Sequence, residues 1–504
     1  MNIVFSKKKP LESKGDAVVL FKFEGEELHD LLGAIDSEFG GEIKRLLSRE
    51  EFKAKEGDVF SFYTFSRIPA SQVVIFGAGK RADFGSAAAL RLGSNIGKYL
   101  RKKGIGEAVF AADGKIGAEL VARIAAGIGL GAYRFRKRSK EKKKEKGLKI
   151  CFCGAAGRGG IERWAGLARA VNFARDLVNE PACDVTPQRL VREARKIAKR
   201  EGLGIRVYSG DELLKKKMRL IHAVGESGKY EPALIHLEYA PANRAKNRKS
   251  RKGFRSYRHE GDKGAIAVIG KGVTFDGGGF HLKTRGNIED MKHDMAGAAA
   301  VMAVMGIIKG LAPDFAVHGI IPAVENILED DSIKPGDVIE AMSGKTVEVV
   351  DTDAEGRLII ADALRYAKEC GAETAIDVAT LTGSCAVALG EFAAGLFSND
   401  DGLADRILKA AESAGEDIWR LPLYKKLRKQ LESDVADLKN VGKRYGGAIT
   451  GALFIEEFAE GMKWAHLDIA GPAYHESEDD LGPRGATGFG VMTLAELLKQ
   501  DWRG

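Results

Sequence analysis

The sequence has few cysteines and no long apolar run, which excludes two broad classes of protein. Only five of 504 residues are cysteines, an odd number without paired spacing, so we expect no disulfide framework and a reducing cytoplasm. The first stretch, MNIVFSKKKPLESKGD, lacks the apolar core of about 7–15 residues that a secretory signal needs. No charge-free run of about 18 apolar residues occurs, so we expect no membrane-spanning helix and no membrane partner.

Three familiar metal or cofactor motifs are also missing. The nine histidines include no HExxH pair, which excludes a helix-borne zinc protease site. Cys151 and Cys153 are separated by one residue in the apolar run KICFCG, whereas zinc motifs want at least two, so a buried strand is expected there. The sequence GAGKRA (77–82) fits a loose dinucleotide fingerprint but lacks a second strand ending in an acid about 20 residues later. An ordinary strand-to-helix turn is the better interpretation.

Positive charge is concentrated in two segments. The chain carries a net charge of +8, while residues 134–149 carry +8 and residues 243–263 carry +7, so the remainder is about −7. Both segments are poor in aliphatic residues and are typical of solvated loops. Binding of nucleic acid or an acidic surface is the alternative interpretation.

The chain is too long for one ordinary core, and its pattern indicates an α/β fold with two domains. Strand-like and helix-like segments alternate in both halves, and several strands are almost wholly apolar, as expected for mostly parallel sheets covered by helices. We predict an N-terminal domain over 1–158, a linker helix over 159–179 and a C-terminal domain over 180–504. Thr186 and Pro187 are expected to begin a helix.

Acidic and basic residues gather at three places in the C-terminal domain: KGVTFDGGGFHLKT (271–284), NIEDMKHDMAGAAAV (287–301) and VDTDAEGRL (350–358). The residues concerned are Lys271, Asp276, Lys283, Asp294, Asp353, Glu355 and Arg357. Ligands of open α/β sheets bind outside the carboxyl ends of the strands, so we expect all three places to meet in one crevice.

Four converging carboxylates would repel one another, and divalent cations remove that repulsion. Oxygen ligands suit magnesium or manganese, and zinc accepts them too. The nearby lysine and arginine side chains can polarise a carbonyl and stabilise an oxyanion. His281 and His293 lie near the acids, and we expect them to be loop or core residues rather than ligands.

At these residues the chain closely resembles the leucyl aminopeptidase family, the cytosol aminopeptidases with two metals per subunit. The family signature NTDAEGRL is matched by DTDAEGRL at 351–358, and the blocks around Lys271 and Asp294 are also similar. Further similarity is found in ARDLVNEPACDVTP, ATLTGSC, GGAITGALF, WAHLDIAG and GATGFGV. The resemblance covers about 174–500 and is looser before that.

The resemblance implies a metal-dependent aminopeptidase, active in the C-terminal domain, that releases N-terminal residues by attack of a metal-bridging water. Two divalent ions, Mn²⁺ or Zn²⁺, would be held by the ligands Lys271, Asp276, Asp294, Asp353 and Glu355. Lys283 and Arg357 would be the catalytic pair, with bicarbonate on the arginine as general base. Met291, Thr380 and Gly383 would line a pocket favouring leucine-like and other apolar residues. The substrates would be peptides, and the assembly a homohexamer.

Two departures from the family pattern leave questions open. Asp351 stands where the signature has Asn, and the chemistry of the site assigns no role to it. The basic segment 243–263 is longer than the usual family loop, so it is the candidate for nucleic-acid binding as an added function. Besides the aminopeptidase and the added nucleic-acid-binding function, the third hypothesis is a different dinuclear hydrolase, such as a phosphoesterase.

Overall fold

The computed structural model describes residues 1–28, 30–111, 116–135, 147–154, 157–241, 264–286 and 288–502. The basic segment 243–263 and most of the other basic segment therefore lie outside the described residues. The chain divides into two compact units: Met1–Asn172 with Ser477–Arg484, and Phe173–Glu476 with Gly485–Gly504. The boundaries predicted above for the two domains and the linker helix, 1–158, 180–504 and 159–179, stay a prediction.

The first unit is built on a six-stranded sheet in the order β1-β6-β5-β2-β4-β3. All neighbours in it are parallel except β3 and β4. The strands are β1 (Asn2–Ser6), β2 (Gly15–Lys22), β3 (Val59–Tyr63), β4 (Ala70–Gly77), β5 (Glu107–Phe110) and β6 (Lys149–Cys153). The KICFCG run is thus a strand, as expected, and its apolar neighbours explain the burial of Cys153.

The helices of this unit follow the apolar periodicity of the sequence. They are α1 (Asp30–Glu38), α2 (Glu42–Arg49), α3 (Ser86–Lys103) and α4 (Ala118–Gly131), and α5 (Arg158–Asn179) continues into the second unit. Between β4 and α3 there is only a short 3-10 turn at Arg81–Asp83, at the position of the GAGKRA sequence.

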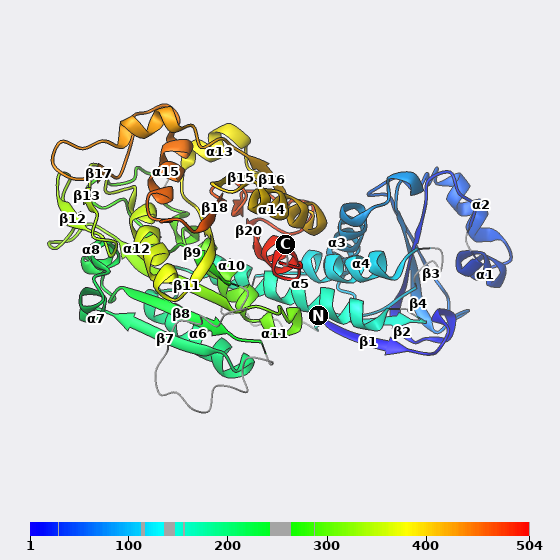
Figure 1. Ribbon diagram of the computed structural model, residues 1–504. Coiled ribbons are helices and arrows are strands. Elements are labelled where there is room, and N and C mark those ends of the chain that lie inside the picture. Colours follow the sequence, from blue (N-terminus) through cyan, green and yellow to red (C-terminus); the bar gives the residue numbers. More distant parts are fainter. Residues whose placement is uncertain are drawn as a thin grey trace. The chain divides into compact units, whose positions relative to one another are not determined.

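The second unit contains a nine-stranded mixed sheet (Figure 1), with the order β16-β15-β18-β14-β9-β11-β8-β7 and β10 paired to β11. The central strands β18, β14, β9, β11 and β10 are parallel, whereas β15, β8 and the edge strand β7 join antiparallel. The strands are β7 (Gly204–Ser209), β8 (Ala233–Tyr239), β9 (Ala265–Gly270), β10 (Gly272–Asp276), β11 (Val317–Asn326), β14 (Ala372–Ala379), β15 (Ala393–Ser398), β16 (Asp417–Arg420) and β18 (Lys463–Asp468).

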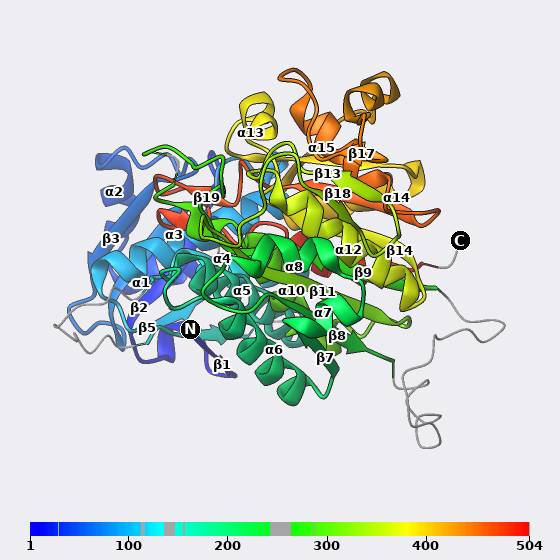
Figure 2. The same cartoon turned by 90° about the vertical axis from the view of Figure 1, so that its left-hand side faces the viewer.

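Helices cover both faces of this sheet, which explains why its central strands are almost wholly apolar. One group contains α7 (Asp211–Lys215), α8 (Arg219–Glu226), α12 (Glu355–Glu369) and α15 (Gly447–Glu456); Figure 2 shows α8 beside α12. The other contains α6 (Pro187–Glu201), α10 (Ala296–Met305), α11 (Ile308–Leu311), α14 (Asp401–Ala414) and α16 (Val491–Leu498). Thr186 caps α6, accepting a hydrogen bond from the Arg189 N–H at 3.3 Å, as predicted.

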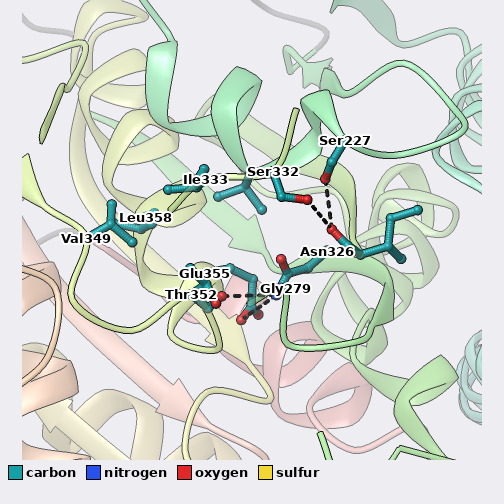
Figure 3. Close-up of a pocket in the computed structure, with 11 residues that line it drawn as sticks. Ser227, Gly279, Asn326, Ser332, Ile333, Val349, Thr352, Glu355 and Leu358 are labelled. Atoms are coloured by element: carbon teal, nitrogen blue, oxygen red, sulfur yellow. Dashed lines mark hydrogen bonds between the residues drawn. The ribbon is translucent and has the colours of Figure 1, made fainter. Parts of the chain in front are cut away.

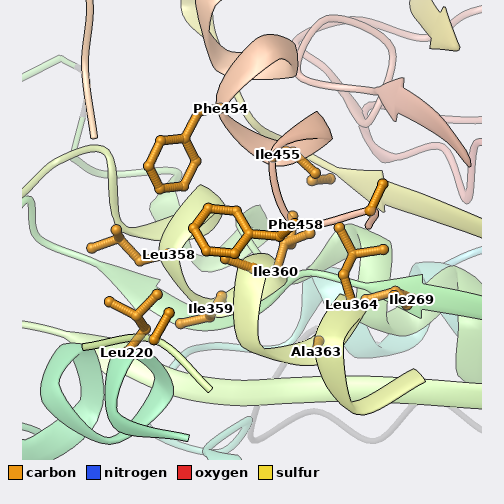
Figure 4. Packing of buried hydrophobic residues seen from close by; sticks show 14 of the residues in the cluster. Leu220, Ile269, Leu358, Ile359, Ile360, Ala363, Leu364, Phe454, Ile455 and Phe458 are labelled. Carbon is orange, nitrogen blue, oxygen red and sulfur yellow. The ribbon is translucent and has the colours of Figure 1, made fainter. Parts of the chain in front are cut away.

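An extensive apolar core lies on the α12 side of the sheet (Figure 4). Leu358, Ile359 and Leu364 of α12 pack there with Phe454 and Phe458, which lie in and just after α15. Burying side chains of this size contributes about 1.5–3 kcal/mol each. This core holds the first turn of α12 in place, and that turn begins with Glu355 of the signature.

The strand-end rule used for the sequence does not apply to the signature segment. The run before that segment, TVEVV (346–350), forms β13 (Thr346–Glu348), which lies outside the large sheet and pairs with β12 (Val338–Glu340) and β17 (Leu438–Lys439) in a separate three-stranded sheet. Local apolar alternation predicts a strand but not the sheet that it joins. A two-stranded ladder of β19 (Tyr474–His475) and β20 (Gly485–Ala486) completes the unit. None of the helices in the described ranges is long and apolar enough to cross a membrane.

Candidate metal centre and active-site cleft

Lys271 lies at the centre of the acidic cluster. It follows β9 directly, and its Nζ is 2.8 Å from Oδ2 of Asp294 and 2.9 Å from Oε1 of Glu355. The same nitrogen donates a hydrogen bond to the Thr380 carbonyl oxygen at 2.9 Å. The side chain is almost completely buried. A lysine without solvent must be either neutral or surrounded by acids, and here it is surrounded by acids.

A second lysine bridges another pair of acids. Lys283 Nζ lies 2.9 Å from Oδ2 of Asp276, the last residue of β10, and 2.5 Å from Oδ1 of Asp353. Asp276 also accepts a hydrogen bond from the Gly278 N–H at 3.0 Å through Oδ1. The glycine-rich loop after β10 therefore turns back to bring Lys283 against the strand from which the loop starts.

Asp294 lies just before α10, at the end of the short 3-10 turn Met291–His293. Its Oδ1 accepts a hydrogen bond from the Thr380 hydroxyl at 2.7 Å, and both side chains are buried. Thr380 thus contacts the acid through its side chain and Lys271 through its backbone. One residue from the loop after β14 fixes the relative positions of the two proposed ligands.

The signature segment supplies two acids from a turn and a helix start. Glu355 is the first residue of α12, where the N-terminal partial charge favours an acid, and it is 1% exposed. Asp353 lies in the preceding turn. Asp351 has a local role that the chemistry of the site did not suggest: its Oδ1 accepts a hydrogen bond from the Asp353 N–H at 2.9 Å. An asparagine could accept the same bond, which explains why the turn tolerates either residue.

Two glycines make room for these contacts. A Cβ on Gly356 would lie 2.5 Å from Cε of Lys271, so α12 can approach the lysine only without a side chain at that position. Gly278 has φ +90, and a Cβ there would lie 2.3 Å from the His281 carbonyl oxygen and 2.9 Å from Oδ1 of Asp353. Gly356 is required for close packing of the helix, and Gly278 for both close packing and its left-handed backbone conformation.

The carboxylate oxygens are arranged as a cation would require. One ligand atom each from Asp276, Asp353 and Glu355 lies within 4.8 Å of the others. Oδ2 of Asp294, Oδ1 of Asp353 and Oε1 of Glu355 are buried, and each lies 2.5–2.9 Å from a lysine nitrogen. Buried carboxylates need positive charge close by, which the lysines provide here and a bound cation would also provide. The donor set of four carboxylates and one lysine therefore fits a pair of divalent ions.

The electrostatics agree with this interpretation. Burial raises the pKa of Glu355 to about 8, and the neighbouring Asp276 adds to the effect while Lys271 opposes it. Burial likewise raises the pKa of Asp294 to about 7. Burial alone would lower the pKa of Lys271, but Asp294, Glu355 and Asp276 raise it overall. The buried acids of this site repel one another and are poorly solvated when ionised, so they favour bound protons and nearby ammonium groups.

A cleft of about 730 Å³ opens onto this cluster. Its walls include the proposed ligands except Glu355, which lies deeper, together with Lys283, Arg357, Met291, Thr380 and Gly383. Arg357 Nη1 donates a hydrogen bond to the Asn440 carbonyl oxygen at 2.7 Å, and its Nε has no hydrogen-bond partner among the described residues. All ten residues predicted from sequence therefore belong to one site, although their individual roles stay a prediction.

The two histidines differ in their surroundings. His281 is 45% exposed at its side chain, and its Nδ1 accepts a hydrogen bond from the Thr352 N–H at 3.2 Å. His293 is half-buried, its ring stacks on Tyr474 with the centroids 5.5 Å apart, and removal from solvent lowers its pKa to about 4. Neither belongs to the group of three acids that could hold an ion.

Asn326, which was not predicted from the sequence, lines a small cavity together with Glu355 and Thr352 (Figure 3). It ends β11 and is the register partner of Asp276 on β10. Its Nδ2 donates to Oδ1 of Asp276 at 2.8 Å and to the Thr352 carbonyl oxygen at 3.1 Å, and lies 3.4 Å from Oε2 of Glu355. The cavity has a volume of about 10 Å³. An asparagine at the end of a strand is too common in sequences to indicate a functional residue.

Two other buried residues shape the cleft without having been predicted. Asn440 Oδ1 accepts hydrogen bonds from the Val350 and Asp351 N–H groups at 2.9 and 3.2 Å, fixing the signature turn. Asp468, at the end of β18, accepts a hydrogen bond from the Thr382 hydroxyl at 2.7 Å and so holds the loop after β14. These residues orient the side chains that face the cleft.

Carboxylates and lysines that converge on a cleft of an α/β domain are typical of metal-dependent hydrolases. Comparison with known families gives the particular class. Residues 172–495 match the cytosol aminopeptidase family, catalytic domain, and residues 18–143 match the N-terminal domain of that family. The chain belongs to the cytosol aminopeptidase family, whose members are metal-dependent peptidases that remove N-terminal residues.

Relatives match nearly the whole chain. A probable cytosol aminopeptidase of Aquifex aeolicus is 39% identical over 492 residues, covering 96% of this chain and 95% of the relative. Among solved structures, a tomato leucine aminopeptidase with a lysine-to-glutamate substitution has a TM-score of 0.85 at 31% identity, covering 99% of this chain and 97% of that one. The bottromycin maturation enzyme BotP in complex with Mn has a TM-score of 0.83 at 32% identity, covering 96% and 99%.

Proposed function

We propose that this peptidase releases leucine-like and other apolar N-terminal residues from peptides with the help of two divalent ions, Mn²⁺ or Zn²⁺. Lys271, Asp276, Asp294, Asp353 and Glu355 would hold the ions, with Asp276 and Glu355 between them. Bound there, such ions supply a water nucleophile at neutral pH and positive charge for the carbonyl oxygen. The observation that carries the proposal is the convergence of four carboxylates and two lysines on one cleft.

Lys283 and Arg357 are proposed as the catalytic pair. Lys283 Nζ contacts only acids among its charged neighbours, and once ions neutralise those acids the ammonium can donate to the scissile carbonyl oxygen. Arg357 is anchored by one nitrogen and keeps others toward the cleft, where it would hold a bicarbonate as general base. Lys271 must lose its proton before its nitrogen can bind an ion.

The side chain of the departing residue would enter the part of the cleft near Met291, Thr380 and Gly383. Gly383 leaves space at the start of α13 (Gly383–Leu389), and Met291 offers a flexible apolar surface. These neighbours support a preference for leucine-like residues. We further propose a cytoplasmic location and a homohexameric assembly. The segment 243–263, the candidate for nucleic-acid binding, lies outside the described part of the chain.

Metal analysis combined with a substrate panel tests the function. Purified protein is stripped of metal, reloaded with Mn²⁺, Zn²⁺ or Co²⁺, and assayed on p-nitroanilides of leucine, methionine, glutamate and lysine, and on p-nitrophenyl phosphate. We expect leucine and methionine to be released fastest and the phosphate ester to stay intact. Hydrolysis of the phosphate ester without release of leucine would instead identify a dinuclear phosphoesterase.

A further inference from the structure

Two positive charges in the cleft remain unused by the proposed chemistry. The cationic side chains lining the cleft are Lys271, Lys283, Arg357, Lys443 and Arg444. The first two contact the acids, and Arg357 binds the Asn440 carbonyl oxygen. Lys443 and Arg444 are exposed, and neither forms an ion pair with any residue in the described part of the chain. Their charges are available to a ligand.

The backbone that carries these two residues is well fixed. Asn440, three residues earlier, accepts the hydrogen bond from Arg357, and the Lys443 N–H donates to Oε1 of Gln430 at 2.7 Å. Gly442 is packed so closely that a Cβ would lie 2.8 Å from the same oxygen. Three residues span at most about 11 Å, so the Lys443 backbone cannot lie far from the residue that binds Arg357. The cations are therefore held near the reacting centre.

The charges of the cleft are divided unevenly. Its acids, Asp276, Asp294, Asp351 and Asp353, come from the segments around the metal centre, where two lysines also lie, whereas the loop 441–444 contributes cations and no acid. A short peptide has an ammonium group at one end and a carboxylate at the other. With the amino terminus at the acids, the carboxylate would point away from them. An arginine fork beside a lysine is well suited to bind it.

We propose that Lys443 and Arg444 bind a substrate carboxylate on the C-terminal side of the scissile bond. The inference rests on the proposed aminopeptidase function and adds a substrate class to it: very short peptides, whose terminal carboxylate comes within reach, or peptides with an acidic second residue. Because both side chains are exposed, the preference should be modest, about three- to tenfold in kcat/KM, and should weaken as salt is added.

Matched substrates test the inference in the metal-loaded enzyme. Leu-Gly and Leu-Gly-amide differ only in the terminal carboxylate, and Leu-Glu-amide and Leu-Gln-amide differ only in a side-chain carboxylate. We expect the wild type to favour the charged member of at least one pair; the pair favoured identifies the source of the carboxylate. The double variant Lys443→Gln/Arg444→Gln should lose that preference while hydrolysing the amides normally. The control Lys425→Gln/Lys426→Gln replaces two exposed lysines outside the cleft and should keep it.

The outcomes separate this inference from the function on which it rests. If the wild type hydrolyses neither Leu-Gly-amide nor Leu-p-nitroanilide, the aminopeptidase proposal itself fails. If it hydrolyses both but treats charged and neutral members of each pair alike, only the carboxylate site is refuted. A preference that survives in the double variant would also refute it, because another part of the chain would then recognise the carboxylate. Normal turnover of Leu-Gly-amide by the variants shows that they are folded.

Discussion

Replacing Asn326 by alanine should weaken metal binding without removing any proposed ligand. The side chain is 5% exposed, and its Nδ2 contacts Asp276 at 2.8 Å and Glu355 at 3.4 Å, the two acids proposed to lie between the ions. A hydrogen bond to a charged group contributes about 1.5–3 kcal/mol. Groups that orient metal ligands typically change metal affinity by about 10–100-fold, or roughly 1.4–2.8 kcal/mol, so the two estimates agree.

The assay for Asn326→Ala is calorimetric titration of the metal-free protein with Mn²⁺, followed by kcat measurement at saturating metal. We expect metal affinity to fall by about 10–100-fold, with most of the turnover recovered when the ions are forced in by excess metal. Asn399→Ala is the matched control, since Asn399 donates to the Met462 carbonyl oxygen at 3.1 Å and accepts from the Trp464 N–H at 2.8 Å. Unchanged metal affinity in Asn326→Ala, or an equal loss in Asn399→Ala, would refute the positioning role.

Three other changes have defined outcomes. Gly356→Ala should favour the helical conformation of α12 by about 1 kcal/mol of intrinsic propensity. It should nevertheless reduce metal affinity, because the new methyl group would lie 2.5 Å from Cε of Lys271. Wild-type metal affinity in this variant would contradict the expectation. Arg357→Ala should lower kcat on the order of 10²-fold while metal content, measured by atomic emission, stays at the wild-type level. Asp400 caps α14, accepting from the Leu403 N–H at 2.7 Å, which lowers its pKa. The charge of Asp400 therefore stabilises the fold at pH values above the pKa of an unfolded aspartate, about 3.9. This stabilisation is lost as the pH falls through the lower pKa that Asp400 has in the folded protein. Asp400→Ala should cost about 1 kcal/mol at pH 7 in urea denaturation. Asp400→Asn keeps a capping oxygen without the charge, so its stability deficit should shrink as the pH falls, and a deficit that is the same at every pH would contradict the assigned charge effect.

The ligand set could be predicted because its members lie in three short blocks with recognisable patterns. Lys271 and Asp276 follow an apolar strand, Asp294 precedes an apolar helix, and Asp353 and Glu355 surround a helix start. Within each block, the local sequence predicts the strand or helix that adjoins the ligands. The rule that strand ends in an α/β sheet share an edge accounts for the approach of Lys271 to Asp276. It does not account for the signature block, because the strand before that block lies in a separate sheet.

The parts that could not be predicted depend on pairing between distant segments. Asn326 reaches Asp276 only because β10 and β11 are paired in one register, and TVEVV gives no sign that its strand joins a different sheet. Asp351 was visible, but its bond to the Asp353 N–H depends on the geometry of the turn. Lys443 and Arg444 read as ordinary surface charges until the structure places them in the wall of the same cleft as the acids.

The acids around Glu355 are proposed to hold the ions that the peptidase needs. Metal content and Leu-p-nitroanilide hydrolysis, measured together in the wild type and in Glu355→Ala, test this role. We expect two ions per chain and rapid hydrolysis for the wild type, and for the variant a loss of bound metal with activity abolished. A Glu355→Ala protein that keeps both ions and full turnover would show that these acids are not the metal ligands.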